Sequence, residues 1–257
     1  MKKAYSSKRK YLFLLGLLSV CLIFFNTACG LDEIDVILDD PFLTDNIPKI
    51  DSENSMSFFA FSTKKLDDDK INNLCKGYIY YKIYNNSSTM QSETGNIESM
   101  INDSARRYYS AATLIENYSY KELYCAENYS KIPQADVFSL DNKSQVIRIR
   151  LTNLDDSLDD YSSRISVGIT VADNVKGIPA RLNNKTFDFG RTGSYDSEPK
   201  KEDDDTRGFS ETPTESKIYY VVLYGVFSMP AESFEKIIYS PVHYLGAVTI
   251  NAVDLNN

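Results

Sequence analysis

A chain of 257 residues is long enough for one sizeable domain or two small ones, and 42% hydrophobic residues are enough to build a core. Five of the 28 basic residues lie in residues 1–28, which contain no acid, so the remainder carries 23 basic and 36 acidic residues, a net charge of −13. Because nucleic-acid binding depends on neutralising phosphates, so acidic a body excludes nucleic acid as a partner.

The first 28 residues have the layout of an export signal. Basic residues within 2–10 precede an unbroken apolar run at residues 11–25. This run has the length of a secretory hydrophobic segment and falls short of the ~20 residues that a membrane-spanning helix needs. Small residues Thr27 and Ala28 then lead into Cys29. The sequence therefore predicts a signal peptide over residues 1–28.

The residues before Cys29 resemble the lipobox of bacterial lipoproteins, in which the chain is cut just before the cysteine and the sulfur is acylated. Asn26 stands where a leucine is usual. Spirochaete lipoproteins tolerate such departures, and the chain is similar to them in being rich in Asn, Lys, Tyr and Ile. The resemblance implies export and lipid attachment at Cys29, with the chain anchored to the cell membrane or outer membrane and facing the periplasm or the exterior. An uncleaved signal anchor and soluble secretion are the alternatives.

Residues 29–54 follow as an acidic tether, which Pro41 and Pro48 interrupt and in which we expect one short strand at 34–38. Beyond it, residues 55–257 alternate apolar and polar residues in short runs between turn-rich segments, a pattern typical of strands. The abundance of aromatic residues, 19 Tyr and 13 Phe, also favours strands. We expect an all-β fold, a β-sandwich, with strands at residues 55–65, 77–88, 145–153, 164–174, 217–228 and 240–253.

Two stretches of the body break this pattern. Within residues 89–131 apolar residues step by three and four, which predicts a partly helical insertion. The residues that carry this pattern are Ile97, Met100, Ile101, Ala105, Tyr108 and Tyr109. Residues 193–216 are charged, with two prolines and almost no apolar residue. We expect a mobile loop there.

Three phrases of the body resemble strands of fibronectin type III domains. They are GYIYYKIY, which starts at residue 77, KIYYVVLYGVFS, which starts at 217, and YSPVHYLGAVTI, which starts at 239. They look like strands C, F and G of that family, and the resemblance implies an immunoglobulin/fibronectin III-like β-sandwich. The chain departs from the family in its long insertion and in having no Trp for the strand B anchor.

Few residues of the body suggest chemistry. Export favours a disulfide between Cys75 and Cys125, with two buried thiols as the alternative. Because His243 is the single histidine and no Cys-x-x-Cys motif occurs, we expect no catalytic cysteine, no zinc site and no cofactor. The acids of residues 154–161 (LDDSLDDY) are the best candidate for a bound cation, with a solvated turn as the alternative. Further acids cluster at residues 67–69 and 202–205.

The sequence thus predicts a membrane-anchored lipoprotein whose head is a non-enzymatic binding or structural module of the cell envelope. The tyrosine-rich segment near residues 106–129 is the expected contact surface for a protein or another envelope partner, because tyrosine supplies a large area at little entropic cost. The alternative for these tyrosines is that they only pack the insertion onto the sandwich. The alternative function is an envelope hydrolase that uses carboxylates or a bound cation.

Overall fold

The computed structural model describes residues 42–46, 58–63, 75–127, 130–132, 146–151, 164–167, 175–189, 197–209, 218–230 and 237–251. All of these belong to one unit, Ile37–Asn257, and Met1–Val36 form a second unit outside the described residues. The expected signal peptide and the strand expected at 34–38 therefore lie outside the described part of the chain.

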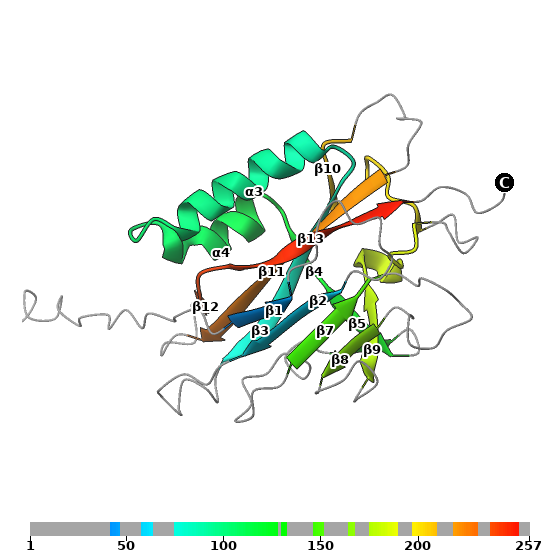
Figure 1. Cartoon of the computed structure of the whole chain (residues 1–257), viewed down its shortest axis with the longest axis horizontal. Helices are drawn as coiled ribbons and strands as arrows, with labels where there is room; N and C mark the ends of the chain where they lie inside the picture. The colour runs from blue at the N-terminus through cyan, green and yellow to red at the C-terminus, as the bar shows by residue number, and fades with distance from the viewer. Residues whose placement is uncertain are drawn as a thin grey trace, which may run out of the picture. The chain divides into compact units, whose positions relative to one another are not determined.

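Seven strands form an antiparallel sheet in the lower part of Figure 1. Their spatial order is β1 (Phe42–Asn46), β2 (Phe59–Thr63), β7 (Val146–Arg150), β8 (Arg164–Val167), β9 (Val175–Ala180), β5 (Tyr124–Glu127) and β6 (Ser130–Ile132). One face of this sheet is apolar. On this face Phe59 and Phe61 of β2 pair directly with Ile149 and Ile147 of β7, and all four side chains are buried.

The second sheet has six strands. Its centre is β11 (Ile218–Pro230), which pairs antiparallel with β3 (Lys76–Tyr84) on one side. On the other side it pairs with β12 (Ile237–Tyr239) and β13 (His243–Asn251). Two short strands pair with β3 as well, β4 (Lys121–Glu122) antiparallel and β10 (Thr206–Arg207) parallel. Because β4 leads through Leu123 into β5, the chain passes from one sheet to the other there.

A helical segment separates β3 from β4. It comprises α3 (Ser87–Ile101), a 3-10 turn η1 (Arg107–Tyr109), α4 (Ser110–Ala112) and a π-helical turn η2 (Thr113–Asn117). The Asn86 side chain caps α3 by accepting a hydrogen bond from the Thr89 N–H at 3.0 Å. Met90 and Ile97 are buried on one face of α3. The helix ends before Asp103, whose carboxylate accepts the N–H of Ala105 at 2.9 Å and so starts a turn.

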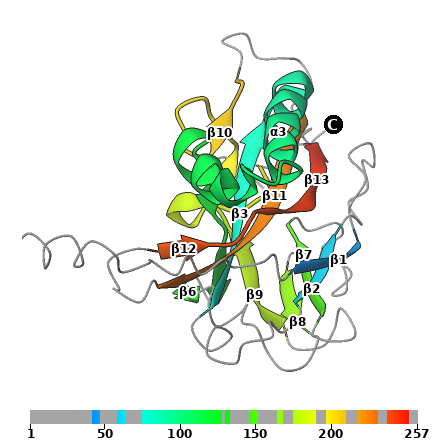
Figure 2. The same cartoon turned by 90° about the vertical axis from the view of Figure 1, so that its left-hand side faces the viewer.

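The six-stranded sheet is buried on both faces. Figures 1 and 2 show the helices over one face and β2, β7 and β8 beyond the other. Toward the helices, Tyr84, Val222 and Tyr224 join Met90 and Ile97 in one apolar cluster. The alternating residues of the same strands, Ile79, Tyr81, Ile83, Val221 and Leu223, are also fully buried. Because both faces of β11 are buried, the sequence at 217–228 carries apolar side chains on both faces of the strand.

The all-β class with a small helical part is confirmed. Each of the six strands expected from alternation overlaps a strand of the structure: β2, β3, β7, β8, β11 and β13. The helix starts earlier than its apolar pattern indicates, at Ser87, and it ends at Ile101, so Ala105 and Tyr108 of that pattern lie outside it.

Candidate functional site

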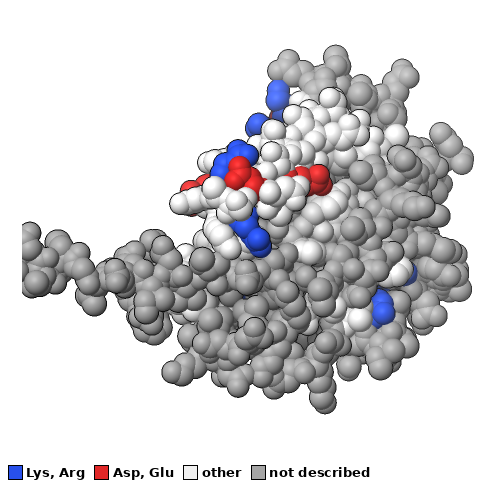
Figure 3. Space-filling view, turned by 60° about the vertical axis from the view of Figure 1, so that its left-hand side comes forward, with Lys and Arg blue, Asp and Glu red and all other residues white. Residues whose placement is uncertain are grey.

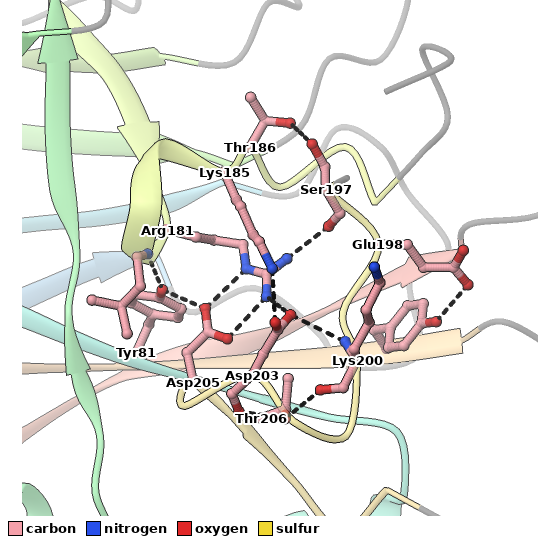
Figure 4. A network of polar contacts seen from close by, with 12 residues as sticks. Tyr81, Arg181, Lys185, Thr186, Ser197, Glu198, Lys200, Asp203, Asp205 and Thr206 are labelled. Atoms are coloured by element: carbon pink, nitrogen blue, oxygen red, sulfur yellow. Dashed lines mark hydrogen bonds and ion pairs between the residues drawn. The ribbon is translucent and has the colours of Figure 1, made fainter. Parts of the chain in front are cut away.

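Arg181 lies at the centre of a buried ion-pair network (Figure 4). Its guanidinium donates hydrogen bonds to both carboxylate oxygens of Asp205 at 2.9 Å, to Asp203 Oδ2 at 2.9 Å and to the Ser197 carbonyl oxygen at 2.6 Å. The Tyr81 hydroxyl donates to Asp205 Oδ2 at 2.6 Å. Every guanidinium nitrogen therefore has an acceptor, and we interpret the network as a structural junction rather than a ligand site.

The junction connects segments that lie far apart in the sequence. Arg181 directly follows β9, and Asp205 directly precedes β10. The Asp205 carbonyl oxygen accepts a hydrogen bond from the Ile83 N–H of β3 at 2.9 Å. Burial lowers the pKa of Arg181, but its hydrogen bonds with Asp205 and the charge of that residue outweigh burial and raise the pKa above its usual value. The guanidinium therefore stays charged, and the buried acids must balance it.

Asp203 and Asp205 belong to residues 193–216, for which the sequence predicts a mobile loop. Within the described part of this stretch, residues 197–209, β10 pairs with β3 and Asp205 is only 2% exposed, whereas residues 200–202, 204 and 207–208 are exposed. The physical reason is charge complementarity, because the acids that make the stretch look solvated bind the buried cation of Arg181.

A second polar network fastens α3 to the six-stranded sheet. Glu93 of α3 accepts hydrogen bonds from the Tyr84 hydroxyl and from Arg207 Nε, both at 2.8 Å, and its carboxylate lies 3.9 Å from Lys82 Nζ. The Tyr84 and Tyr120 hydroxyls are 2.9 Å apart. Burial lowers the pKa of Lys82 to about 8 against the opposing effect of the Glu93 charge. These buried groups satisfy one another, so this network also reads as structural.

The third feature is a surface of the helical segment that combines two arginines with two exposed tyrosines. We call it the 106–109 corner, and its residues are Arg106, Arg107, Tyr108 and Tyr109. Of the tyrosines in the described residues, only Tyr108 and Tyr109 are exposed, at 36% and 67%. The guanidinium carbon of Arg107 lies 5.3 Å from the Tyr108 ring centroid, and Arg106 Nε lies 2.7 Å from Asp103 Oδ2. Figure 3 shows charged side chains of both signs gathered in one region of the described surface, with further basic side chains at the top and at the lower right.

The four tyrosines of residues 106–120 therefore divide into two groups. Tyr120 is buried at 2% exposure, and Tyr118 is half-buried against the apolar cluster, so both pack the helical segment onto the sheet as the alternative interpretation holds. Tyr108 and Tyr109 remain available for contact.

The predicted cysteine and acidic sites are only partly described. Cys29 lies outside the described residues, as do the acids at 67–69 and 154–161. Cys75 is buried just before β3, and burial raises the pKa of its thiol to about 11. Cys125 lies in β5, but its side chain is outside the described part, so the disulfide stays a prediction. His243 is half-buried at the start of β13.

Comparisons with protein-family models, with curated proteins and with solved structures find no match to this chain. Within the described ranges, no group of three or more His, Cys, Asp or Glu side chains could hold a metal ion. Over the same part of the chain, no helix combines the length and the apolar character needed to cross a membrane. The 106–109 corner is thus the candidate functional surface that the geometry supports best.

Proposed function

We propose that the chain is an exported lipoprotein, acylated at Cys29, whose head is a non-enzymatic binding module of the cell envelope. The signal-like residues 1–28 and the acidic residues between Cys29 and β1 support the anchor, while β1 (Phe42–Asn46), within the expected tether, pairs with β2. Two or more acyl chains on one cysteine give stable membrane attachment, since each buried CH₂ contributes about 0.8 kcal/mol.

The finer fold in this proposal is an immunoglobulin/fibronectin III-like β-sandwich with added strands. The three phrases that resemble strands C, F and G are β3, β11 and β13, and they lie side by side in that order with antiparallel pairing. Neighbouring C, F and G strands in one sheet are a property of immunoglobulin-like sandwiches. The strands β8 and β9 and the helical segment are then elaborations of this frame.

The exposure of Tyr108 and Tyr109 carries the binding part of the proposal. Exposed aromatic residues next to arginine are the composition of protein-binding surfaces, since both types supply much contact area per side chain. Three of the carboxylates that could have supported hydrolysis already accept hydrogen bonds from arginine: Asp203, Asp205 and Glu93. We therefore favour binding over the alternative of an envelope hydrolase.

A capture experiment with matched variants tests this function. The parent chain, a Tyr108→Ser/Tyr109→Ser variant and an Ile178→Ser control are immobilised and exposed to envelope extract. Ile178 is a suitable control because it is 48% exposed and lies in β9 of the other sheet. We expect a partner that the parent and the control capture and that the double variant loses. Equal capture by all three proteins, or by none, would refute the assignment of the 106–109 corner.

A further inference from the structure

Three arginines and one serine stand on the face of the seven-stranded sheet that points away from the apolar side chains. We call this group the arginine face: Arg148, Arg150, Arg164 and Ser166. Arg150 of β7 pairs directly with Arg164 of β8, and Arg148 of β7 pairs with Ser166 of β8. Because side chains alternate along a strand, all four residues lie opposite the buried isoleucines of β7 and β8. Side chains in register have Cβ atoms about 4.5–5.5 Å apart, so strand pairing itself brings the arginines together.

The strands around the arginine face contain no acidic residue of their own. This holds for β2, β7 and β8 over their whole length. On β2 the neighbour of Arg148 is Ala60, which has a short, uncharged side chain. Like charges directly opposite one another in a sheet are destabilising, as Arg150 and Arg164 are here. Since the chain beyond residue 28 has a net charge of −13, its composition does not explain three cations in so small an area.

The arginine face is covered by other parts of the chain. Arg150 is 7% exposed, Arg164 is 9% exposed and Ser166 is fully buried. All three arginines also interact with further groups of the chain, so it is their summed charge that matters here. A guanidinium has five N–H donors and can therefore serve several acceptors at once. Because these side chains are covered, a ligand that binds to them must be small.

The Ser166 hydroxyl is a second, independent sign of a ligand. Its oxygen is buried and finds no hydrogen-bond partner among the described residues. Buried polar groups in folded proteins nearly always have a partner, so each exception needs an explanation. Ser166 lies directly across from Arg148 on the same face. Its O–H is therefore placed to donate to an anion that the guanidinium groups also bind.

A phosphate group matches this set of donors. Guanidinium groups bind phosphate through pairs of parallel hydrogen bonds, and phosphate brings several acceptor oxygens and nearly two negative charges. A single carboxylate has one charge and two oxygens, which is too little for three guanidinium groups and a hydroxyl. The donor set thus favours phosphate over a carboxylate.

We propose that Arg148, Arg150, Arg164 and Ser166 form a binding site for a small phosphate compound, either inorganic phosphate or a phosphate monoester. This site goes beyond the proposed function, because it shares no residue with the 106–109 corner and can fail or succeed independently. The alternative source of negative charge is the group of four Asp in residues 154–161, which follow β7 in the sequence, precede β8 and lie outside the described residues.

Thermal unfolding of the full chain in a nonionic detergent, near neutral pH and at low salt, measures the binding of inorganic phosphate. We expect a dissociation constant of about 0.1 mM, so about 10 mM phosphate should raise the melting temperature by roughly 5–10 °C. Sodium chloride of the same ionic strength should not. Arg148→Gln and Ser166→Ala should each weaken binding about tenfold, which lowers the rise to about half. Lys76→Gln removes an exposed base of the six-stranded sheet and should keep the full rise.

Two further arms identify the source of the negative charge. The first is a variant in which all four Asp of residues 154–161 become Asn, and we expect it to respond to phosphate as the parent does. A response in this variant alone would show that the chain's own acids fill the arginine face, and it would overturn the proposal. A parent that does not respond would also overturn it, as would a full response in either Arg148→Gln or Ser166→Ala. In the second arm, tighter binding of glycerol 3-phosphate than of inorganic phosphate assigns the site to a phosphate monoester, and the reverse order assigns it to free phosphate.

Discussion

Replacing Asp205 with Asn removes one negative charge from the buried network and keeps the size of the side chain. Arg181 is fully buried and Asp205 is 2% exposed, so water cannot replace the lost charge. Breaking a buried ion pair in this way costs about 3–5 kcal/mol, and because Asp203 still holds the guanidinium, we expect about 3 kcal/mol. For a domain of this size that loss lowers the melting temperature by roughly 6–12 °C.

Urea unfolding followed by circular dichroism measures this loss, and two further variants separate charge from packing. Asp103→Asn removes the acid of an exposed pair with a similar distance, 2.7 Å to Arg106, and should leave stability unchanged within error. Arg181→Met combined with Asp205→Asn should cost less than the sum of the single changes by about 2 kcal/mol, because the unpaired buried charge is gone. If Asp205→Asn is as harmless as Asp103→Asn, the reasoning about this network is refuted.

Two other predictions concern stability. Gly95→Ala adds a methyl group where α3 has open space, and it should stabilise the fold by about 0.5–1 kcal/mol. Gly208 has φ +71°, and a Cβ there would lie 3.0 Å from Thr89, so Gly208→Ala should destabilise the fold by about 1 kcal/mol or more. The same urea assay measures both variants, and the reverse order of stability would show that the backbone argument fails. Burial raises the pKa of Tyr84 and of Tyr120 well above 10, so above about pH 10 the unfolded chain binds fewer protons and stability falls as pH rises. A distinct further step in tyrosinate absorbance should then accompany the loss of circular dichroism, and unfolding without such a step would count against this prediction.

The central strands were predictable because burial follows alternation. In β7, Ile147, Ile149 and the following Leu151 are buried as the pattern predicts, although Arg150 is buried as well. The strand β9 was not predicted, because it contains Gly177 and Pro179, which weaken any strand pattern. Short strands such as β4 and β10 have two residues each, too few to show a period.

The polar networks could not be predicted for a different reason. Arg181 and Asp205 are 24 positions apart in a charged region, and nothing in the sequence singles out which acid meets which base. Glu93 likewise looks like an ordinary surface residue of a helix until the helix is placed on the sheet, where Tyr84 bonds to it. Within the segment that the sequence indicated as a contact surface, Tyr108 and Tyr109 are exposed, whereas Tyr120 belongs to the buried network.

The anchor at Cys29 is the central claim of this account, and acyl labelling tests it most directly. Cells that express the parent chain or Cys29→Ala are fed a palmitate analogue, and the protein is then recovered for mass analysis of its N-terminus. We predict label on the parent, with an N-terminus that begins at Cys29, and none on the variant. Recovery of the parent from the cytosol at full length, unlabelled and with residues 1–28 intact, would contradict the account.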